Sequence, residues 1–174
     1  RLGREQLDGL LANHPRALGI ADITQAEALE RAGLTVFSPQ EWIQSLASST
    51  NTAFDEDDDV DTDAPAVVIY TSGTTSAPKG VLLRHENLTS YVFGSVEFAS
   101  AEETDAALVS VPPYHIAAVA NVIPNLYAGR RTMVLEQFTP DQWLDTVRRE
   151  EITNALVVPT MLARIVESGA DKSV

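Results

Sequence analysis

The stretch that decides the fold lies at residues 67–83 and reads VVIYTSGTTSAPKGVLL. It starts as an apolar run typical of a buried strand, passes through hydroxyl residues and glycine, and ends in a second apolar run. Backbone amides around Gly73 can point inward and form a cradle for phosphate oxygens, and Lys79 adds a mobile positive charge for the outer phosphates. The hydroxyls that surround Gly73 are Thr71, Ser72, Thr74 and Thr75. The pattern therefore predicts a phosphate-binding loop between two strands.

Two other interpretations of this loop fit less well. A P-loop needs G-x-x-x-x-G-K-[ST] followed by a helix. Here Pro78 stands where the second glycine belongs, Gly80 stands where the magnesium-binding hydroxyl belongs, and a strand-like segment follows. A plain hairpin turn would need only one Gly or Pro, so the density of hydroxyls argues against it.

The rest of the chain alternates between strand-like apolar runs and segments with helical periodicity, which predicts an α/β layered fold with a largely parallel sheet flanked by helices. Strands are expected at residues 17–21, 34–37, 66–70, 80–84, 106–111, 131–135 and 155–158. Helices are expected at residues 4–13, 24–31, 39–46, 87–98, 115–127, 140–150 and 160–168.

Two helix starts share one capping pattern, at residues 37–42 and 138–143. Each has a hydroxyl N-cap, proline at the first helical position, Glu or Gln three residues after the cap, and an aromatic pair placed as a hydrophobic staple. Capping chemistry explains the match without an ancestral repeat, so both patterns are interpreted as structural.

The composition narrows the class of protein but does not indicate an activity. The chain has 174 residues, is 44% hydrophobic and carries a net charge of −13, so it can bury a core and suits one domain or one lobe of a larger one. It has no cysteine, which excludes disulfides, thiolate zinc sites and a cysteine nucleophile. The acidity argues against binding to nucleic acid.

Much of the acidity lies in one run, residues 55–63, which holds seven of the 25 acidic residues. We interpret the run as a solvated surface loop, because it lacks the glycine and the closing glutamate of a calcium loop. The most apolar segment, residues 116–128, is too short and too polar to span a membrane, and no segment of the given sequence resembles a secretion signal. We expect a cytoplasmic protein without a transmembrane segment.

Tyr70 to Val81 closely resembles the signature loop of the adenylate-forming (AMP-binding) superfamily, which includes acyl-CoA synthetases, luciferase and peptide-synthetase adenylation domains. That loop typically reads Tyr-Thr-Ser-Gly-Thr-Thr-Gly-x-Pro-Lys-Gly-Val, and eleven of the twelve positions agree here. Ser76 stands where the family usually has glycine. A glycine with positive φ at that position would make Ser76 a source of strain or of a local change in the loop.

Two further segments resemble the family. Residues 110–118, SVPPYHIAA, are similar to its strand that ends in Pro-x-aromatic-His beside the acyl and nucleotide pocket, with Ala118 in place of the usual glycine. Residues 157–161, VVPTM, resemble its strand-to-helix junction. The resemblance is weak before residue 60 and firm from about residue 64 to residue 168.

The resemblance implies roles for single residues. His115 would lie near the acyl carboxylate and the nucleotide. The β- and γ-phosphates of ATP would be held by Thr71, Ser72, Gly73, Thr74, Thr75 and Lys79. Mg²⁺ would bridge the phosphates, a carboxylic acid, fatty or aryl, would be activated as acyl-AMP, and coenzyme A would accept the acyl group.

The family completes its site with an aromatic-Gly-x-Thr-Glu segment, a ribose-binding aspartate and a catalytic lysine in a small C-terminal domain. The chain has no counterpart of these, and its two lysines are Lys79 and Lys172. We therefore expect residues 1–174 to be part of an N-terminal AMP-binding domain, without the C-terminal lobe and inactive by itself. The alternatives are an adenylation domain that loads a carrier protein and a nucleotide-binding module without catalysis.

Overall fold

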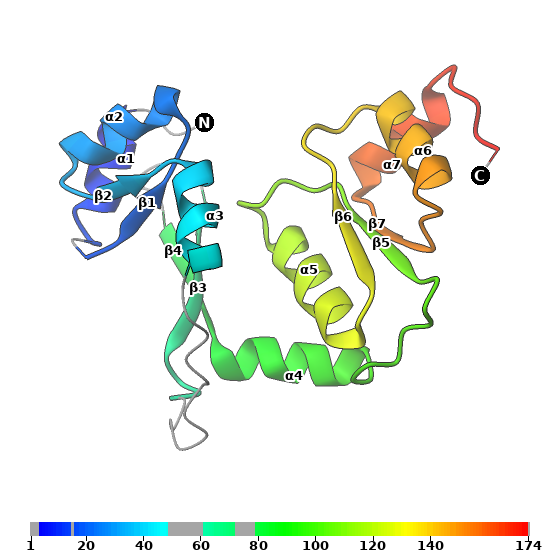
Figure 1. Ribbon diagram of the computed structural model, residues 1–174, viewed down its shortest axis with the longest axis horizontal. Coiled ribbons are helices and arrows are strands. Elements are labelled where there is room, and N and C mark those ends of the chain that lie inside the picture. Colours follow the sequence, from blue (N-terminus) through cyan, green and yellow to red (C-terminus); the bar gives the residue numbers. More distant parts are fainter. Residues whose placement is uncertain (1–3, 15, 49–60, 72–78, 174) are drawn as a thin grey trace. The chain divides into compact units, whose positions relative to one another are not determined.

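The computed structural model describes residues 4–14, 16–48, 61–71 and 79–173. The chain divides into two compact units (Figure 1). The first contains residues 1–60 and 71–79, and the second contains residues 61–70 and 80–174. Each unit is described separately below.

The first unit is a small α/β assembly built around two parallel strands. It contains α1 (Arg4–Leu11), β1 (Leu18–Ile20), α2 (Ile23–Arg31), β2 (Thr35–Phe37) and α3 (Pro39–Ser48), and β1 pairs with β2. The strands can lie close to α2 because Gly19 has no Cβ, which would come within 2.9 Å of the Leu29 side chain. Gly33, with φ of +85°, ends the turn after α2 in a conformation that glycine adopts without strain.

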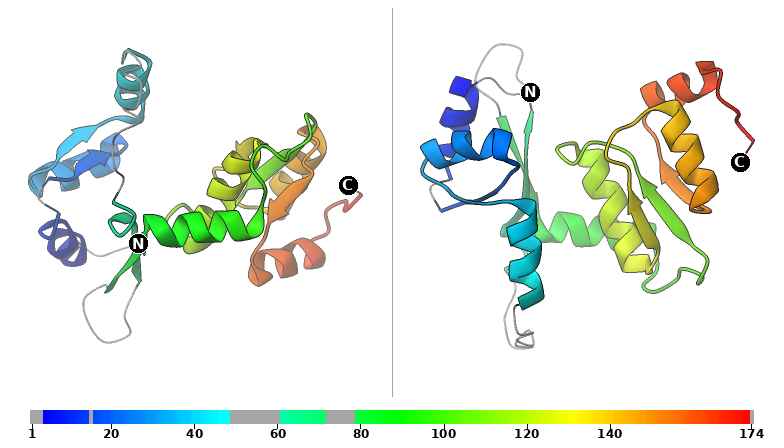
Figure 2. Two further views of the ribbon diagram at one scale, coloured as in Figure 1. Left: turned by 90° about the horizontal axis from the view of Figure 1, so that it is seen from below. Right: turned by 45° about the horizontal axis from the view of Figure 1, so that its top comes forward.

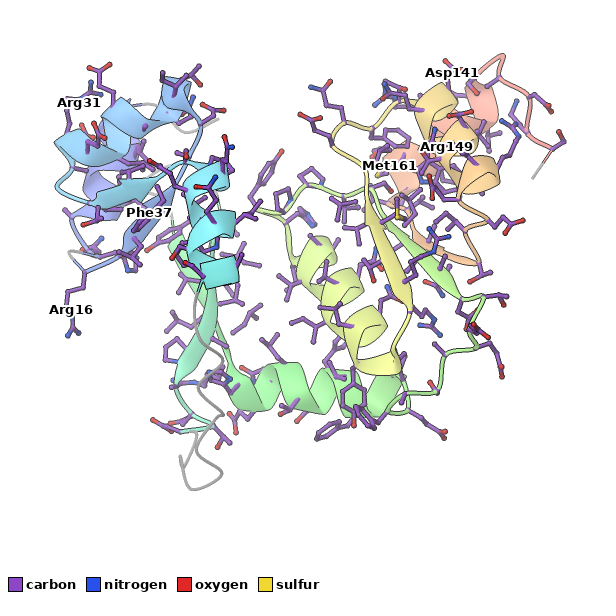
Figure 3. The ribbon with its side chains drawn as sticks, viewed as in Figure 1. Arg16, Arg31, Phe37, Asp141, Arg149 and Met161 are labelled. Atoms are coloured by element: carbon purple, nitrogen blue, oxygen red, sulfur yellow. The ribbon has the colours of Figure 1, made fainter. Side chains whose placement is uncertain are left out.

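The predicted cap of α3 is confirmed. Ser38 Oγ accepts a hydrogen bond from the Glu41 N–H at 3.2 Å, and the Glu41 carboxylate accepts from both the N–H and the hydroxyl of Ser38 at 2.8 Å. These bonds form a capping box. The rings of Phe37 and Trp42 lie 5.8 Å apart on either side of the cap, and Figure 3 labels Phe37 between the sheet and α3.

The second unit is a three-stranded parallel sheet with helices on its faces, preceded by a strand pair and one helix. Its sheet has the order β6-β5-β7, and every pairing in it is parallel. The elements are β3 (Pro65–Thr71), β4 (Lys79–Arg84), α4 (His85–Ser95), β5 (Ala106–Val109), α5 (Ile116–Ala128), β6 (Arg131–Val134), α6 (Pro140–Arg149), β7 (Asn154–Leu156) and α7 (Pro159–Glu167), of which β3 pairs with β4.

The strand order places the helices of this sheet on opposite faces. The chain leaves the central strand β5, forms α5 and reaches one edge as β6, and it then passes back through α6 to the other edge as β7. Right-handed crossovers that run in opposite directions place their helices on opposite faces. Figures 1 and 2 show α5 on one face and α6 with α7 on the other.

The core of the second unit is centred on β5, whose four residues are all buried. Leu108 is 0% exposed. At the carboxyl end of the strand, a buried apolar cluster joins β5 to helices on both faces, and its members are Val109, Val111, Ala118 and Met161. Figure 3 labels Met161, which reaches from α7 toward the sheet. The centre of a parallel sheet is covered on both sides, which is why this strand has no polar face.

A polar network joins α5 to β5 and extends to the opposite, amino end of the sheet. Asn121 and Asn125 are 4% and 3% exposed and occupy one face of α5. Asn121 donates to the Leu108 carbonyl at 3.3 Å, and Asn125 donates to Asn121 at 2.7 Å. Arg130 donates to Asn125 Oδ1 at 3.0 Å, which extends the network toward the residues that precede the strands.

Asp105 anchors this end of the sheet. Its carboxylate accepts from the Thr153 hydroxyl at 3.0 Å and lies 4.0 Å from the Arg130 guanidinium. Thr153 Oγ1 also accepts from the N–H of Ala106 at 3.1 Å. The polar groups that begin β5, β6 and β7 therefore satisfy one another and stabilise the sheet.

The predicted architecture is confirmed in its fold class and in the type of each element. Each of the predicted strands and helices is present, with ends that differ by a few residues. The largest difference is at α4, which begins at His85 rather than residue 87 and ends at Ser95 rather than residue 98. Among the described residues, no helix has both the length and the apolar character needed to cross a membrane.

Candidate functional site

The described ends of the candidate phosphate loop are held close together. Thr71 ends β3 and Lys79 begins β4, and the Thr71 hydroxyl donates to the Lys79 carbonyl oxygen at 3.4 Å. Both residues are exposed. The two strands predicted on either side of the candidate loop are confirmed, and the strand at β4 excludes a P-loop, whose lysine would open a helix. Ser72, Gly73, Thr74 and Thr75 lie outside the described residues.

Glycine at position 80 is explained by the close packing of the two strands. A Cβ at Gly80 would lie 3.3 Å from both the Tyr70 ring and the Val68 side chain. That spacing is tighter than an ordinary contact, so a larger residue would push the Tyr70 ring outward. Gly80 therefore lets the Tyr70 ring pack closely against the backbone of β4.

His115 lies in the second unit, at the start of α5. It is the N-cap residue, and its Nδ1 atom accepts a hydrogen bond from the Ala117 N–H at 3.1 Å. Its backbone N–H donates to the Pro112 carbonyl at 3.0 Å, and its own carbonyl accepts from the Ala118 N–H at 2.9 Å. The side chain is exposed. The turn therefore holds His115 in one orientation while one edge of the ring stays open.

His115 lies in the connection that follows β5, at the carboxyl edge of the sheet, where α/β proteins bind ligands. The connection after β5 leads to α5 on one face, and the connection after β7 leads to α7 on the other face. Neighbouring parallel strands whose connections diverge in this way form a switch point, and ligands of open α/β sheets bind at the carboxyl ends there. Ser110 follows β5 at this edge and is buried, with its hydroxyl accepting from the Trp143 indole N–H at 3.2 Å.

The contact between Trp143 and Ser110 was not foreseen from the sequence. The pattern at residues 138–143 predicts Trp143 as part of a hydrophobic staple, and the predicted cap itself is present, because the Thr139 hydroxyl accepts from the Gln142 N–H at 3.2 Å. Phe138 lies beneath the guanidinium of Arg164, 5.1 Å from its ring centroid. A buried serine and a tryptophan 33 positions apart carry no local sequence signal of their contact.

Among the described residues, the carboxyl groups whose pKa is shifted make hydrogen bonds that stabilise local structure. Hydrogen bonds from Ser38 lower the pKa of Glu41, and hydrogen bonds from Arg149 and Arg131 lower the pKa of Glu150. Within the part of the chain that the structure describes, no group of three or more His, Asp or Glu side chains is arranged to hold a metal ion.

Comparison with known proteins decides the family. The model of the AMP-binding enzyme family matches residues 9–174. The chain belongs to this family. The match covers nearly the whole sequence and both units, and it agrees with the signature loop at Tyr70–Val81.

Two curated relatives illustrate the family's range. An indoleacetate–CoA ligase of Aromatoleum aromaticum is 30% identical over 145 residues, which cover 80% of this chain and 28% of that protein. A fatty acid–[acyl-carrier-protein] ligase of Streptomyces coeruleorubidus is 36% identical over 113 residues, which cover 60% of this chain and 21% of that protein. The chain thus matches less than a third of the length of either relative.

Solved structures share the fold. The N-terminal domain of FACL13 from Mycobacterium tuberculosis, solved with an inhibitor, superposes with a TM-score of 0.77 at 21% identity over 97% of this chain and 44% of that one. The O-succinylbenzoate coenzyme A synthetase of Bacillus subtilis, in complex with ATP and magnesium ion, gives a TM-score of 0.72 at 23% identity over 95% of this chain and 34% of that one. These likenesses confirm an α/β fold of the kind found in the N-terminal domain of adenylate-forming enzymes.

Proposed function

We propose that residues 1–174 form part of the N-terminal AMP-binding domain of a longer ATP-dependent acid–thiol ligase. The whole protein activates a carboxylic acid as acyl-AMP and transfers the acyl group to coenzyme A. The observation that carries this proposal is the loop between β3 and β4, whose hydroxyl and lysine residues occur in the family's own order. The protein is cytoplasmic, and it works without binding nucleic acid.

The described ends of the loop suit a polyphosphate. A threonine hydroxyl and a lysine ammonium are a hydrogen-bond donor and a positive charge, the two kinds of group that phosphate oxygens need. In the proposed reaction, Thr71, Ser72, Gly73, Thr74, Thr75 and Lys79 hold the β- and γ-phosphates of ATP. They orient the α-phosphorus for in-line attack by the carboxylate and stabilise the departing pyrophosphate. Magnesium would offset the negative charge of these phosphates.

The acid belongs at the carboxyl edge of the β6-β5-β7 sheet. His115 stands there with an open ring edge, and the apolar residues of α5 begin directly after it. Such surroundings suit a fatty or an aryl tail. The names of the two relatives, an indoleacetate ligase and a fatty acid ligase, support both classes.

The test is ATP–pyrophosphate exchange by the full-length protein with a panel of fatty and aryl acids. Exchange that depends on the added acid supports the proposal, and no exchange with any acid refutes it. Detection of acyl-AMP by mass spectrometry rules out a nucleotide-binding module that has lost catalysis.

A carrier-protein thiol is the second candidate acceptor, and the 36% identity to a fatty acid–[acyl-carrier-protein] ligase favours it. The two acceptors are separated by a transfer assay on the preformed acyl-AMP. Coenzyme A is supplied in one reaction, and a phosphopantetheinylated carrier protein is supplied in the other. If thioester forms only with the carrier protein, the acyl acceptor is the carrier-protein thiol and not coenzyme A.

A further inference from the structure

Three aromatic side chains from different elements meet on the surface of the second unit. Phe93 belongs to α4, Tyr127 belongs to α5, and Phe98 lies in the connection between α4 and β5. The centroid of the Tyr127 ring lies 5.6 Å from that of Phe93 and 5.2 Å from that of Phe98. Phe93 is 66% exposed and Phe98 is 74% exposed. We call these three residues the aromatic patch, and Figure 1 shows the carboxyl ends of α4 and α5 side by side there.

The backbone holds Phe98 in a defined position. The N–H of the next residue, Ala99, donates to the Tyr127 carbonyl at 3.1 Å, and the Ala101 N–H donates to the Ala128 carbonyl at 2.9 Å. Ala99 has φ of +49°, a left-handed conformation that costs a residue with a Cβ about 1–2 kcal/mol. Strained backbone of this kind persists where the surrounding structure fixes it, and it is concentrated at functional sites. The exposed ring of Phe98 is therefore presented by a fixed turn.

Three carboxylates lie in the same connection as Phe98. Glu97 precedes Phe98, and Glu102 and Glu103 follow within five positions. All three are exposed, and within the described part of the second unit none of them forms an ion pair. Arg130, which follows the turn after α5, is already engaged in the polar network at the amino end of the sheet. The aromatic patch therefore has an acidic rim, and an aromatic centre with a charged rim is typical of protein–protein interfaces.

We propose that the aromatic patch and its rim, Glu97, Glu102 and Glu103, dock a segment of another protein that presents arginine or lysine beside apolar side chains. Contiguous exposed apolar side chains mark interaction sites, and aromatic residues often dominate the binding energy of such sites. A guanidinium group can pair with a carboxylate and stack on an aromatic ring at the same time. The inference goes beyond the proposed function and does not depend on it.

The charge of the rim decides between possible occupants. A two-fold interface with a second copy of this chain would bring the same patch together twice, so carboxylates would face carboxylates. An anionic membrane surface would repel the rim for the same reason. A basic partner is the occupant whose charge complements all three side chains.

The probe is a fluorescent amphipathic peptide of roughly 16 residues, with leucine on one helical face and arginine along the edges of that face. A peptide of the same pattern with glutamate in place of arginine is the charge control. Fluorescence anisotropy measures binding to the full-length protein, and deuterium exchange locates the site. We expect the arginine peptide to bind, to slow amide exchange across residues 96–105, and to lose affinity as the salt concentration rises. The glutamate peptide should not bind.

Substitutions separate docking at this patch from general attraction to an acidic protein. Phe98→Ser should weaken binding about 5- to 30-fold, the usual effect of removing an aromatic anchor. Replacing Glu97, Glu102 and Glu103 together with glutamine should weaken binding and reduce its salt dependence. The matched control removes the same charge from exposed carboxylates elsewhere in the second unit and should change the affinity less than about twofold. Its substitutions are Glu136→Gln, Asp141→Asn and Glu167→Gln.

Phe93→Ser is a second test of the patch, because it removes an exposed ring without changing the connection that carries Phe98. The glutamine variant keeps every ring in place, so it tests the proposal even if a serine variant unfolds. Equal losses in the glutamine variant and its matched control, full affinity in both serine variants, or protection confined to other segments overturns the inference. An unreactive thiol in Phe98→Cys of the free full-length protein also overturns it, because another part of the same chain then covers the patch.

Discussion

Replacing Tyr91 with phenylalanine is expected to loosen α5, because the Tyr91 hydroxyl supplies a hydrogen bond that this helix cannot make by itself. Pro124 lies inside α5 and is buried. Proline has no N–H, so the carbonyl of Ala120, four residues earlier, lacks its intrahelical donor. The Tyr91 hydroxyl, on α4, donates to that carbonyl at 3.2 Å.

The size of the effect follows from the geometry. A hydrogen bond contributes about 0.5–1.5 kcal/mol net, and hydroxyl donors usually lie about 2.7–2.8 Å from the acceptor, so the longer distance favours the lower half of that range. Tyr91 is 47% exposed and Ala120 is half-buried, so water can reach the freed oxygen and offset most of its desolvation penalty. We expect Tyr91→Phe to cost about 0.5–1 kcal/mol.

The assay is deuterium exchange of the α5 amides in the full-length protein, where this cost corresponds to roughly two- to fivefold faster exchange. The same substitution is then made in a Pro124→Ala background, in which the new N–H can serve the Ala120 carbonyl. There Tyr91→Phe should have almost no effect, because the hydroxyl is no longer needed.

Tyr127→Phe is the matched control. Its ring packs against Phe93 and Phe98, with centroids 5.6 and 5.2 Å away, and its hydroxyl has no partner among the described residues. An equal effect of Tyr91→Phe in both backgrounds, or no effect in either, would refute the reasoning.

Three other predictions concern the loop, a cap and the polar network. Lys79→Ala should raise the KM for ATP in the full-length protein about 10- to 100-fold while acid binding changes little, and equal losses in both would contradict a phosphate role. Hydrogen bonds from Ser38 lower the pKa of Glu41 from 4.5, so the capping box stabilises α3 above that pH, and its contribution is lost as the pH falls below it. Amide exchange of α3 should become faster as this contribution is lost. Glu41→Gln should abolish the pH dependence. Asn125→Ala should destabilise the protein by about 1–3 kcal/mol in chemical unfolding, whereas Asn13→Ala, which removes an exposed bond to the Gly9 carbonyl, should cost less than about 0.5 kcal/mol.

The type and order of the helices and strands could be predicted because the signals for them are local. The capping box at Ser38 and Glu41 uses residues three positions apart, and the apolar run that predicts a strand such as β5 is recognised within a few residues. The motif that predicts the phosphate loop is equally local, since its residues are contiguous. Element ends were less accurate, as at α4, because the last turn of a helix depends on its neighbours.

Contacts between distant segments could not be predicted in the same way. The pairs Tyr91 with Ala120 and Trp143 with Ser110 are separated by 29 and 33 positions, and nothing in either local sequence names the partner. The polar residues Asn121 and Asn125 carry no local signal of a partner. Their role in the buried network depends on the strand that the helix covers.

The sequence by itself determined the family, the α/β class and the residues expected to hold phosphate, because short-range periodicity and a contiguous motif encode them. Only the tertiary structure decided how the sheet is ordered, which polar groups meet at its amino end, and which nitrogen of His115 faces outward. Those features depend on hydrogen bonds between groups that folding brings together.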